Sequence, residues 1–373
     1  MARLSIHRHF ATLQDPRRVR RRCRHRFLDI VIIAICAVIA HCDDWQEIEI
    51  FARGRLDWFR RFLPLPHGVP SHDTFERIFD RIDPRAFQAC FQEWIGALAA
   101  CVDVRQIAID GKTLCGSATS KLGPLHLVSA WATEQHLSLA QLTVAEGSNE
   151  IPAIPKLLEL LDVNGALVSL DAGGCHKAIA QKILDRGGDY VLVVKDNQPK
   201  LLAAIQEHMG AAFDGLVDDC SERQTTDQGH GRQELRIYTT CPAPAELQAD
   251  WPGLKVIGTC YHERTVQGKT STEMRYFIGS KAAGARYYGK ALRHHWRIEN
   301  CCHWQMDVTF GEDASRIRKR HAAENFALLR RLALSLLQQY PVKRSVKCKR
   351  LAACLDPTIL EEILRVGTKR EKV

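Results

Sequence analysis

Two aspartates each follow a short apolar run that is typical of a buried strand. Asp110 ends the run QIAID and Asp171 ends the run ALVSLD, and glycine follows each of them within two residues. The carboxyl ends of strands are where ligands bind in an open α/β sheet, and glycine there lets a bulky substrate approach the backbone. Two acids at neighbouring strand ends repel each other unless a cation lies between them. Mg²⁺ takes oxygen ligands and completes its shell from substrate phosphates, so the pair predicts a magnesium site. The alternative is that each aspartate caps the helix or turn that follows it.

A third carboxylate, Glu299, lies in the segment HHWRIENCCHW (294–304), which is dense in His, Trp and Cys. On a helix it shares a face with His295 one turn before it, and with Cys302 and His303 one turn after it. A carboxylate flanked by imidazoles suits a site that handles phosphate. Two alternatives stay open. One is a zinc site made of Glu299 with these imidazoles and the thiol, although zinc sites with thiolate usually pair ligands from separate elements. The other is a polar helix face with a satisfied Glu–His pair.

Helical patterns fill the chain from residue 27 to about 102. The apolar run Ile30–Ala40 begins about thirty residues in, lacks an A-x-A site and is too short to span a bilayer, so we predict a buried helix rather than a signal peptide. Further helices are predicted over Trp45–Phe62, over Ser71–Ile82 and from Asp83, where aspartate and proline form a cap and first turn. Together these helices predict a small all-α domain.

Strand patterns begin after residue 103. The predicted strands are Gln106–Asp110, Leu125–Thr133, Leu137–Ala145, Ala166–Asp171 and Asp189–Lys195, with helices over Ile154–Leu161 and Lys177–Arg186. A meander of three strands followed by alternating α and β elements is the order of a mixed α/β sheet with helices on its faces, and it is also found in the RNase H-like fold. Residues 216–280 carry several short strand-like runs and predict a β-rich insertion. Helical patterns return over 282–303 and 321–340.

Charge is distributed unevenly along the chain. The 52 Lys and Arg against 43 Asp and Glu give +9, but residues 1–26 carry +8, residues 314–373 carry +10, and the chain between them carries −9. This excludes a chain that is basic throughout, and it suits an enzyme whose acidic body gathers carboxylates while its ends hold a polyanion. The 14 cysteines are scattered without a CxxC pair, which predicts reduced thiols in a cytoplasmic protein.

Seven segments together carry a family resemblance. They are HCDDWQEIEIFARGRLDWFRRFL (41–63), LPHGVPSHDTFERIF (65–79), IAIDGKTLCGS (107–117), EGSNEIPAIPKLLELLD (146–162), LVSLDAGGCHKAIAQKI (167–183), YVLVVKDNQP (190–199) and HHWRIENCCHWQMDVTFGEDASRIR (294–318). In this order they resemble the insertion-sequence transposases of the DDE superfamily, in the branch of the H-repeat-associated proteins. The first two segments resemble the domain that precedes the catalytic core in that branch.

The resemblance implies an α/β fold with an RNase H-like mixed sheet and a β-rich insertion, preceded by a small all-α domain. The implied parts are a basic arm (1–26), the all-α domain (27–102), the catalytic domain (103–340, with the insertion at about 216–280) and a basic C-terminal tail with a short helix (341–373). The partner it implies is double-stranded DNA, both the terminal inverted repeats and the target, bound by a homodimer. The implied location is the bacterial cytoplasm, with no membrane association.

The resemblance also places Asp110, Asp171 and Glu299 at the positions of the family's acidic triad. These carboxylates would bind Mg²⁺, with Mn²⁺ as a second candidate, for in-line displacement at phosphorus. The same site would cut the ends of the element and then join them to target DNA. Related transposases carry an arginine one turn before the glutamate, where this chain has His295, a weaker and pH-dependent cation.

Basic residues near the triad and at both ends are predicted to contact DNA phosphates. They are Arg17, Arg18, Arg20, Arg21, Arg22, Arg24, Arg26, Lys112, Lys195, His295, Arg297, Arg316, Arg318, Lys319 and Arg320. The segment KRSVKCKR (343–350) is predicted to be a further contact with the DNA backbone. The alternatives are an arm that aids solubility and lysines that are solvated surface residues.

The chain departs from the family pattern at three positions. Cys115 stands where Arg is usual, Gly173 where Met is usual and His176 where Gln is usual. The loss of an arginine beside Asp110 leaves a second hypothesis open, a catalytically inactive transposase remnant that still binds DNA. A third hypothesis is a zinc-dependent DNA-binding regulator built around the adjacent cysteines at 301 and 302 and His303.

Overall fold

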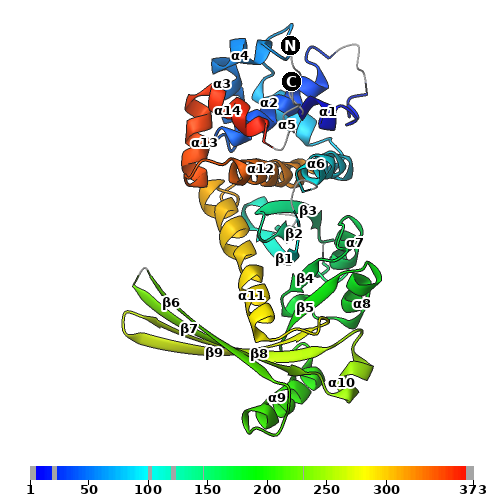
Figure 1. The fold of residues 1–373 in the computed structure, drawn as a ribbon. Coiled ribbons are helices and arrows are strands. Elements are labelled where there is room, and N and C mark those ends of the chain that lie inside the picture. The colour runs from blue at the N-terminus through cyan, green and yellow to red at the C-terminus, as the bar shows by residue number, and fades with distance from the viewer. Residues whose placement is uncertain are drawn as a thin grey trace, which may run out of the picture.

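The computed structural model describes residues 6–18, 23–99, 103–118, 123–145, 147–229 and 231–366. Helices from the two ends of the chain gather at one end of the molecule, and a nine-stranded sheet follows, whose strands β6–β9 form a long arm near the other end (Figure 1). The predicted α/β class, with N-terminal helices and a β-rich insertion, is confirmed.

The N-terminal segment forms six helices within the described residues. They are α1 (Ile6–Phe10), α2 (Phe27–Ile39), α3 (Trp45–Gly54), α4 (Leu56–Arg60), α5 (His72–Phe79) and α6 (Pro84–Ala99). A helix that is apolar on all sides must lie inside a core, and each residue from Ile30 to Ala40 is at most 1% exposed. The predicted buried helix is therefore confirmed. Within the described part of the chain, no helix combines the length and the apolar character needed to cross a membrane.

The central sheet is covered by helices on both faces. Its strands are β1 (Gln106–Leu114), β2 (Leu125–Ala132), β3 (Leu137–Thr143), β4 (Leu167–Leu170) and β5 (Asp189–Val194), in the order β3-β2-β1-β4-β5. β1 is antiparallel to β2 and parallel to β4, and β4 is parallel to β5. Side chains alternate between the faces of a strand: Val168 and Leu170 join the core under α7 (Ala153–Glu159) and α8 (Lys177–Asp185), whereas Leu167 packs with α11 (Ala285–His295).

The β-rich insertion continues the same sheet. β6 (Ser221–Gly229), β7 (Arg232–Pro242), β8 (Val256–Val266) and β9 (Lys269–Gly279) follow β5 in the order β9-β8-β7-β6, and α9 (Pro199–Phe213) and α10 (Ala245–Asp250) accompany them. Apolar patterning could reveal only the second half of β9, because its first half is polar and exposed, and it could not reveal β6, which is polar and has no buried residue along its length. The prediction that all cysteines are reduced is wrong at Cys220 and Cys241, which form a disulfide.

The C-terminal segment packs against the N-terminal helices. It contains α12 (Ala322–Gln339), α13 (Val346–Leu355) and α14 (Pro357–Leu364), so two helices stand where one was expected after residue 340. Arg350 is fully buried, and its Nη2 donates to the Val38 carbonyl at 3.0 Å and to Asp43 at 2.7 Å. The predicted DNA contact over 343–350 therefore does not fit at Arg350 or at the buried Lys349. The expected domain boundary at 102 lies outside the described residues, and the boundary at 340 stays a prediction.

Candidate active site

Asp110 and Asp171 occupy matching positions on neighbouring parallel strands. Ile109 of β1 pairs with Leu170 of β4, and each aspartate is the next residue in its chain. The prediction that Asp110 ends its strand is wrong, because β1 continues to Leu114 by pairing with β2, with Asp110 opposite Ser129. The parallel pairing nevertheless stops at the aspartates, so both carboxylates come from the same level of the sheet.

Glu299 reaches Asp110 from the helical segment that follows α11. After a turn at Trp296, the backbone is π-helical over Glu299–His303 (η4) and Gln305–Thr309 (η5). Such π-helical turns occur frequently at functional sites. One ligand atom from each of Asp110, Glu299 and His303 lies within 4.8 Å of the others, and His303 Nδ1 is 3.5 Å from the Asp110 carboxylate and 3.3 Å from that of Glu299.

Burial and neighbouring charge set the protonation of these acids. The pKa of Asp110 is raised to about 6, chiefly because the group is buried; the imidazole of His303 opposes this rise and the charge of nearby Asp171 adds to it. The pKa of Glu299, which lies at the exposed edge, is instead lowered, chiefly by its hydrogen bond with His303. A buried acid whose ionised form is unfavourable, beside other acids, is typical of a site that takes up positive charge.

A fourth carboxylate, which the sequence analysis did not single out, lies against the site. A Cβ atom at Gly111 would lie 1.7 Å from the Glu150 carboxylate, so glycine is what allows this close approach. His126 Nε2 holds the same carboxylate at 2.7 Å. Glu150 also contributes to the raised pKa of Asp110. The segment EGSNEIP, which contains Glu150, is one of those that carry the family resemblance, but Gly111 and His126, which Glu150 approaches, lie in other elements of the chain.

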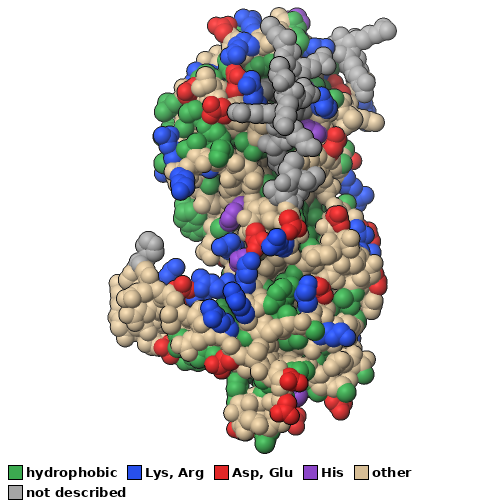
Figure 2. All heavy atoms as spheres, in the orientation of Figure 1, with side chains coloured by type: hydrophobic (Ala, Val, Ile, Leu, Met, Phe, Trp, Pro, Cys, Tyr) green, Lys and Arg blue, Asp and Glu red, His purple; other side chains and the backbone are tan. Residues whose placement is uncertain are grey.

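The predicted cations near the triad differ in their accessibility. Lys112 is only 8% exposed and pairs with Asp307 and, at 3.7 Å, with Asp313. Lys195 is exposed just after β5. Arg297 is exposed and lines a cavity of about 690 Å³ between the β6–β9 arm and α11, where Lys and Arg side chains gather (Figure 2).

His295 does not fit the role of a phosphate-binding cation. It is 3% exposed, and its Nδ1 lies 3.1 Å from the Ser169 hydroxyl of β4. Burial lowers its pKa to about 4, so the ring is neutral at physiological pH. The sequence placed it one turn from Glu299 but could not show that this face of the helix packs on the sheet.

The predicted DNA contacts at the two ends fall into four groups. Arg17, Arg18, Arg24 and Arg320 line one groove, Arg26 lines a separate cavity, and Arg20, Arg21 and Arg22 lie outside the described residues. The remaining three are exposed: Arg316, Arg318 and Lys319. Arg318 Nε donates to the Gly116 carbonyl at 2.7 Å, and Lys319 pairs with Glu76 at 2.9 Å, so both also hold chain segments together.

The zinc site considered from the sequence is not assembled among the described residues. The group of ligand atoms that they form around Glu299 contains His303 and Asp110 but no cysteine. Cys302 is fully buried, which raises the pKa of its thiol, and His295 is bound to Ser169. The zinc-dependent regulator built on these residues therefore has no support in the geometry.

Comparison with known proteins places the chain in a family. The model of the "Transposase DDE domain" matches residues 86–336, and the model described as "DDE_Tnp_1-associated" matches residues 7–95. The chain belongs to the DDE transposase family. It is similar to the "Putative transposase YncI" of Escherichia coli O157:H7, with 39% identity over 91% of this chain and 90% of that protein. It is also similar to the "H repeat-associated putative transposase YhhI" of Escherichia coli K12, with 35% identity over 95% of this chain and 96% of that protein.

Family membership agrees with the strand order of the sheet, which is that of the RNase H-like fold. A solved structure of the piggyBac transposase synaptic complex with hairpin DNA matches with a TM-score of 0.43 and 9% identity, covering 99% of this chain and 78% of that one. The DDE family implies a divalent metal, and the donor set fits one. Two carboxylates and an imidazole lie close together, and Nε2 of His303 is buried without a hydrogen-bond partner among the described residues.

Proposed function

We propose that this DDE-family chain cleaves DNA at the ends of an insertion sequence and transfers those ends into target DNA. Its catalytic carboxylates would be Asp110, Asp171 and Glu299. The observation that supports the proposal most is that Asp110 is related to both other acids. It follows the residue that pairs with Leu170, next to Asp171, and it shares a group of ligand atoms with Glu299. Neither capping nor surface solvation requires these two relations.

The same carboxylates would hold Mg²⁺, with Mn²⁺ as an alternative. When bound, a divalent cation supplies Lewis-acid stabilisation of the charge that develops at the scissile phosphate. Asp110 favours such binding because burial disfavours its ionised form, as its pKa of about 6 indicates, and added positive charge offsets that cost. His303 orients the carboxylates of Asp110 and Glu299 by placing one ring nitrogen near both.

The substrate we propose is double-stranded DNA, first at the terminal inverted repeats and then at the target. Arg297 and Lys195 are exposed cations and would contact phosphates without reading base sequence. We propose a homodimer in the DNA complex, since an element has two ends to cut, and we propose the bacterial cytoplasm as its location.

The test is excision from a plasmid that carries the element between its own terminal repeats. The full chain with Mg²⁺ or Mn²⁺ should release the element, and Asp110→Asn, Asp171→Asn and Glu299→Gln should each abolish release while DNA binding persists. The control is Glu207→Gln on the exposed face of α9, which should excise like the unaltered chain. Full activity in any one of the three variants would remove that residue from the catalytic set.

The inactive remnant remains a second candidate because of one feature beside the site. Cys115, where the family usually has arginine, is exposed, and its backbone N–H lies 3.4 Å from the Asp313 carboxylate. A remnant would bind the repeat-bearing DNA but release no element under any metal condition. Recovery of excision in Cys115→Arg would then identify the missing cation as the cause.

A further inference from the structure

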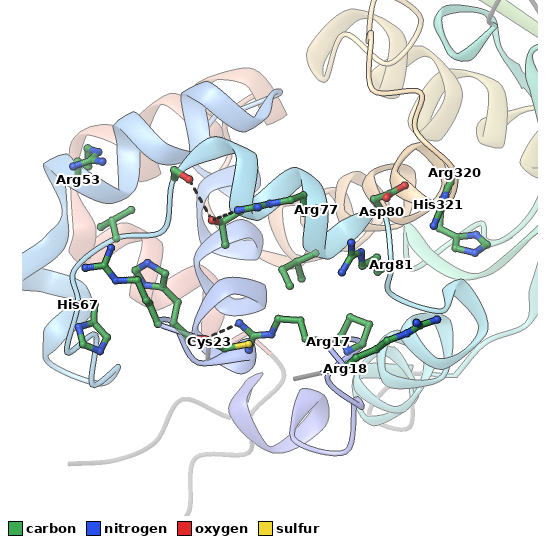
Figure 3. A pocket seen from close by; sticks show the side chains of 17 residues that line it. Arg17, Arg18, Cys23, Arg53, His67, Arg77, Asp80, Arg81, Arg320 and His321 are labelled. Atoms are coloured by element: carbon green, nitrogen blue, oxygen red, sulfur yellow. Dashed lines mark hydrogen bonds between the residues drawn. The ribbon is translucent and has the colours of Figure 1, made fainter. Parts of the chain in front are cut away.

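A basic groove lies between the N-terminal arm, α5 and the residues that lead into α12. It encloses about 1120 Å³, and its described lining contains seven arginines, three histidines and a single acid, Asp80. Figure 3 shows Arg53 and His67 on one side of the hollow, Arg320 and His321 on the other, and Arg77 and Arg81 between them. We call this surface the arginine groove.

The arm that forms one wall is fastened to itself by Arg17. The guanidinium donates to the Asp15 carboxylate at 2.8 and 2.7 Å and to the His25 carbonyl at 2.9 Å. These bonds bring together two parts of the arm that lie on either side of residues 19–22. The backbone of this wall is therefore held in place at Arg17 by hydrogen bonds, which an arm that only aids solubility would not need.

Several cations of the groove lack a countercharge within the part of the chain that the structure describes. Arg18, Arg24, Arg81 and Arg320 are exposed and have no ion-pair partner among the described residues. Arg53, which also lines the groove, is by contrast paired with Glu49 at 2.7 Å. Unpaired like charges on facing walls repel one another unless a polyanion lies between them.

The backbone at Arg320 adds an independent observation. Its φ is +34°, in the left-handed region that glycine adopts easily and other residues rarely do. Such strain is characteristic of positions where the side chain has a role. Here the strained residue supplies an unpaired guanidinium to the groove wall.

The lining of the groove indicates a nucleic-acid backbone rather than a metabolite. Small-molecule pockets are mostly apolar and of about 300–1,000 Å³, whereas the apolar residues of this described lining are only Pro16, Cys23, Val69 and Ile78. Cations on several walls suit phosphates that recur along a duplex.

One chain segment connects the groove to the candidate active site. Asp313 pairs with Lys112 at 3.7 Å beside the site, Arg318 donates to the Gly116 carbonyl at 2.7 Å, and Arg320 follows two residues later in the groove. A Cβ atom at Gly116 would lie 2.4 Å from the Ser315 carbonyl, so this segment packs directly on the turn that follows β1. A duplex held in the groove is thus held by the same segment that borders the carboxylates.

We propose that the arginine groove binds the sugar-phosphate backbone of the duplex at the element end, without reading its sequence, next to the site of cleavage. This proposal rests on the proposed function for the identity of the DNA. The groove would orient the end so that its terminal phosphate lies toward Asp110 and Glu299.

The test measures the salt dependence of binding rather than cleavage. Fluorescence anisotropy in EDTA follows binding of two labelled duplexes of equal length, one carrying an element end and one scrambled, between 50 and 200 mM salt. Each lost phosphate contact lowers the slope of log affinity against log salt by about 0.9. The double variant Arg81→Ala/Arg320→Gly should therefore lower the slope by about 1.8 for both duplexes. The charge-matched control is Arg60→Ala/Arg286→Ala, on exposed residues of α4 and α11 outside the described lining, and it should leave the slope unchanged.

A second readout separates lost contacts from misfolding. Arg320→Gly alone should raise the thermal midpoint, because glycine adopts this φ without strain, while it lowers the salt slope. An unchanged slope in the double variant, an equal fall in the control, or a fall seen with duplex RNA but not with DNA would overturn the proposal. If the slope falls as expected but the unaltered chain never cuts DNA, the proposed function fails and the groove stands. If the unaltered chain cuts DNA but the double variant has an unchanged salt slope, the groove proposal fails and the proposed function stands.

Discussion

Removing one partner of the buried ion pair between Glu312 and Arg331 should destabilise the fold severely, whereas removing both should not. Both side chains are 0% exposed, and Arg331 Nη1 lies 3.0 Å from the Glu312 carboxylate. Glu312→Leu leaves a buried guanidinium without its countercharge, which costs about 3–5 kcal/mol. The pair matters for function because it fixes the segment beside Asp313 onto α12.

The double replacement Glu312→Leu/Arg331→Met tests the sign of the pair's own contribution. Nε and Nη2 of Arg331 and Oε2 of Glu312 have no hydrogen-bond partner among the described residues. When a buried ion pair leaves some of its polar atoms without hydrogen bonds, the attraction between the two charges hardly offsets the free-energy cost of removing them from water. The double variant should therefore be as stable as the unaltered chain, or more stable by about 1–4 kcal/mol.

Urea denaturation followed by tryptophan fluorescence measures the four members of this cycle. The exposed pair Lys182–Glu159, at 2.9 Å, is the control, and Glu159→Gln should cost less than about 1 kcal/mol. A loss below about 1 kcal/mol for Glu312→Leu, or additive effects of the two replacements, would refute the reasoning that this pair is desolvated and coupled.

Three further predictions concern the site and the arm. Asp110→Asn should stabilise the fold at pH 8 but hardly at pH 4. The folded-state pKa of Asp110 is about 6, above the unfolded value of 3.8, so ionisation of this carboxyl lowers the stability of the fold as pH rises through that window, and asparagine cannot ionise. Urea denaturation at the two pH values measures the difference. Gly111→Ala should displace the Glu150 carboxylate, since the added Cβ would lie 1.7 Å from it, and should reduce excision while leaving DNA binding intact; unchanged excision would separate Glu150 from the reaction. Reduction of Cys220–Cys241, which closes a loop of sequence separation 21, should lower the stability by about 3 kcal/mol, and a Cys220→Ala/Cys241→Ala variant should lose its response to dithiothreitol.

The sequence predicted those parts of the fold that depend on local patterns. The helix over the apolar run at Ile30 and the strands that lead into Asp110 and Asp171 follow local apolar patterns, and tertiary contacts did not change them. It could not predict how far β1 extends past Asp110, because that depends on pairing with β2. Nor could it predict that His295 faces β4 or that Glu150 approaches Gly111, since both contacts join residues more than 35 positions apart.

The family resemblance predicted the three carboxylates, but only the structure shows which of the predicted basic residues are accessible to DNA. Arg297 and Arg350 are both arginines in basic stretches, yet one is exposed in a cavity and the other is fully buried against α2. A charge count treats them alike. Their difference comes from packing of the C-terminal helices, which the local sequence does not encode.

The contact between α13 and α2 has a consequence for synthesis of the protein on the ribosome. Arg350 binds the Val38 carbonyl and Asp43, more than three hundred residues earlier in the chain, and α13 and α14 share one apolar core with α2. α2 therefore completes its packing only after α13 and α14 have left the exit tunnel. We expect a nascent chain that stops before α13 to leave an apolar face of α2 exposed.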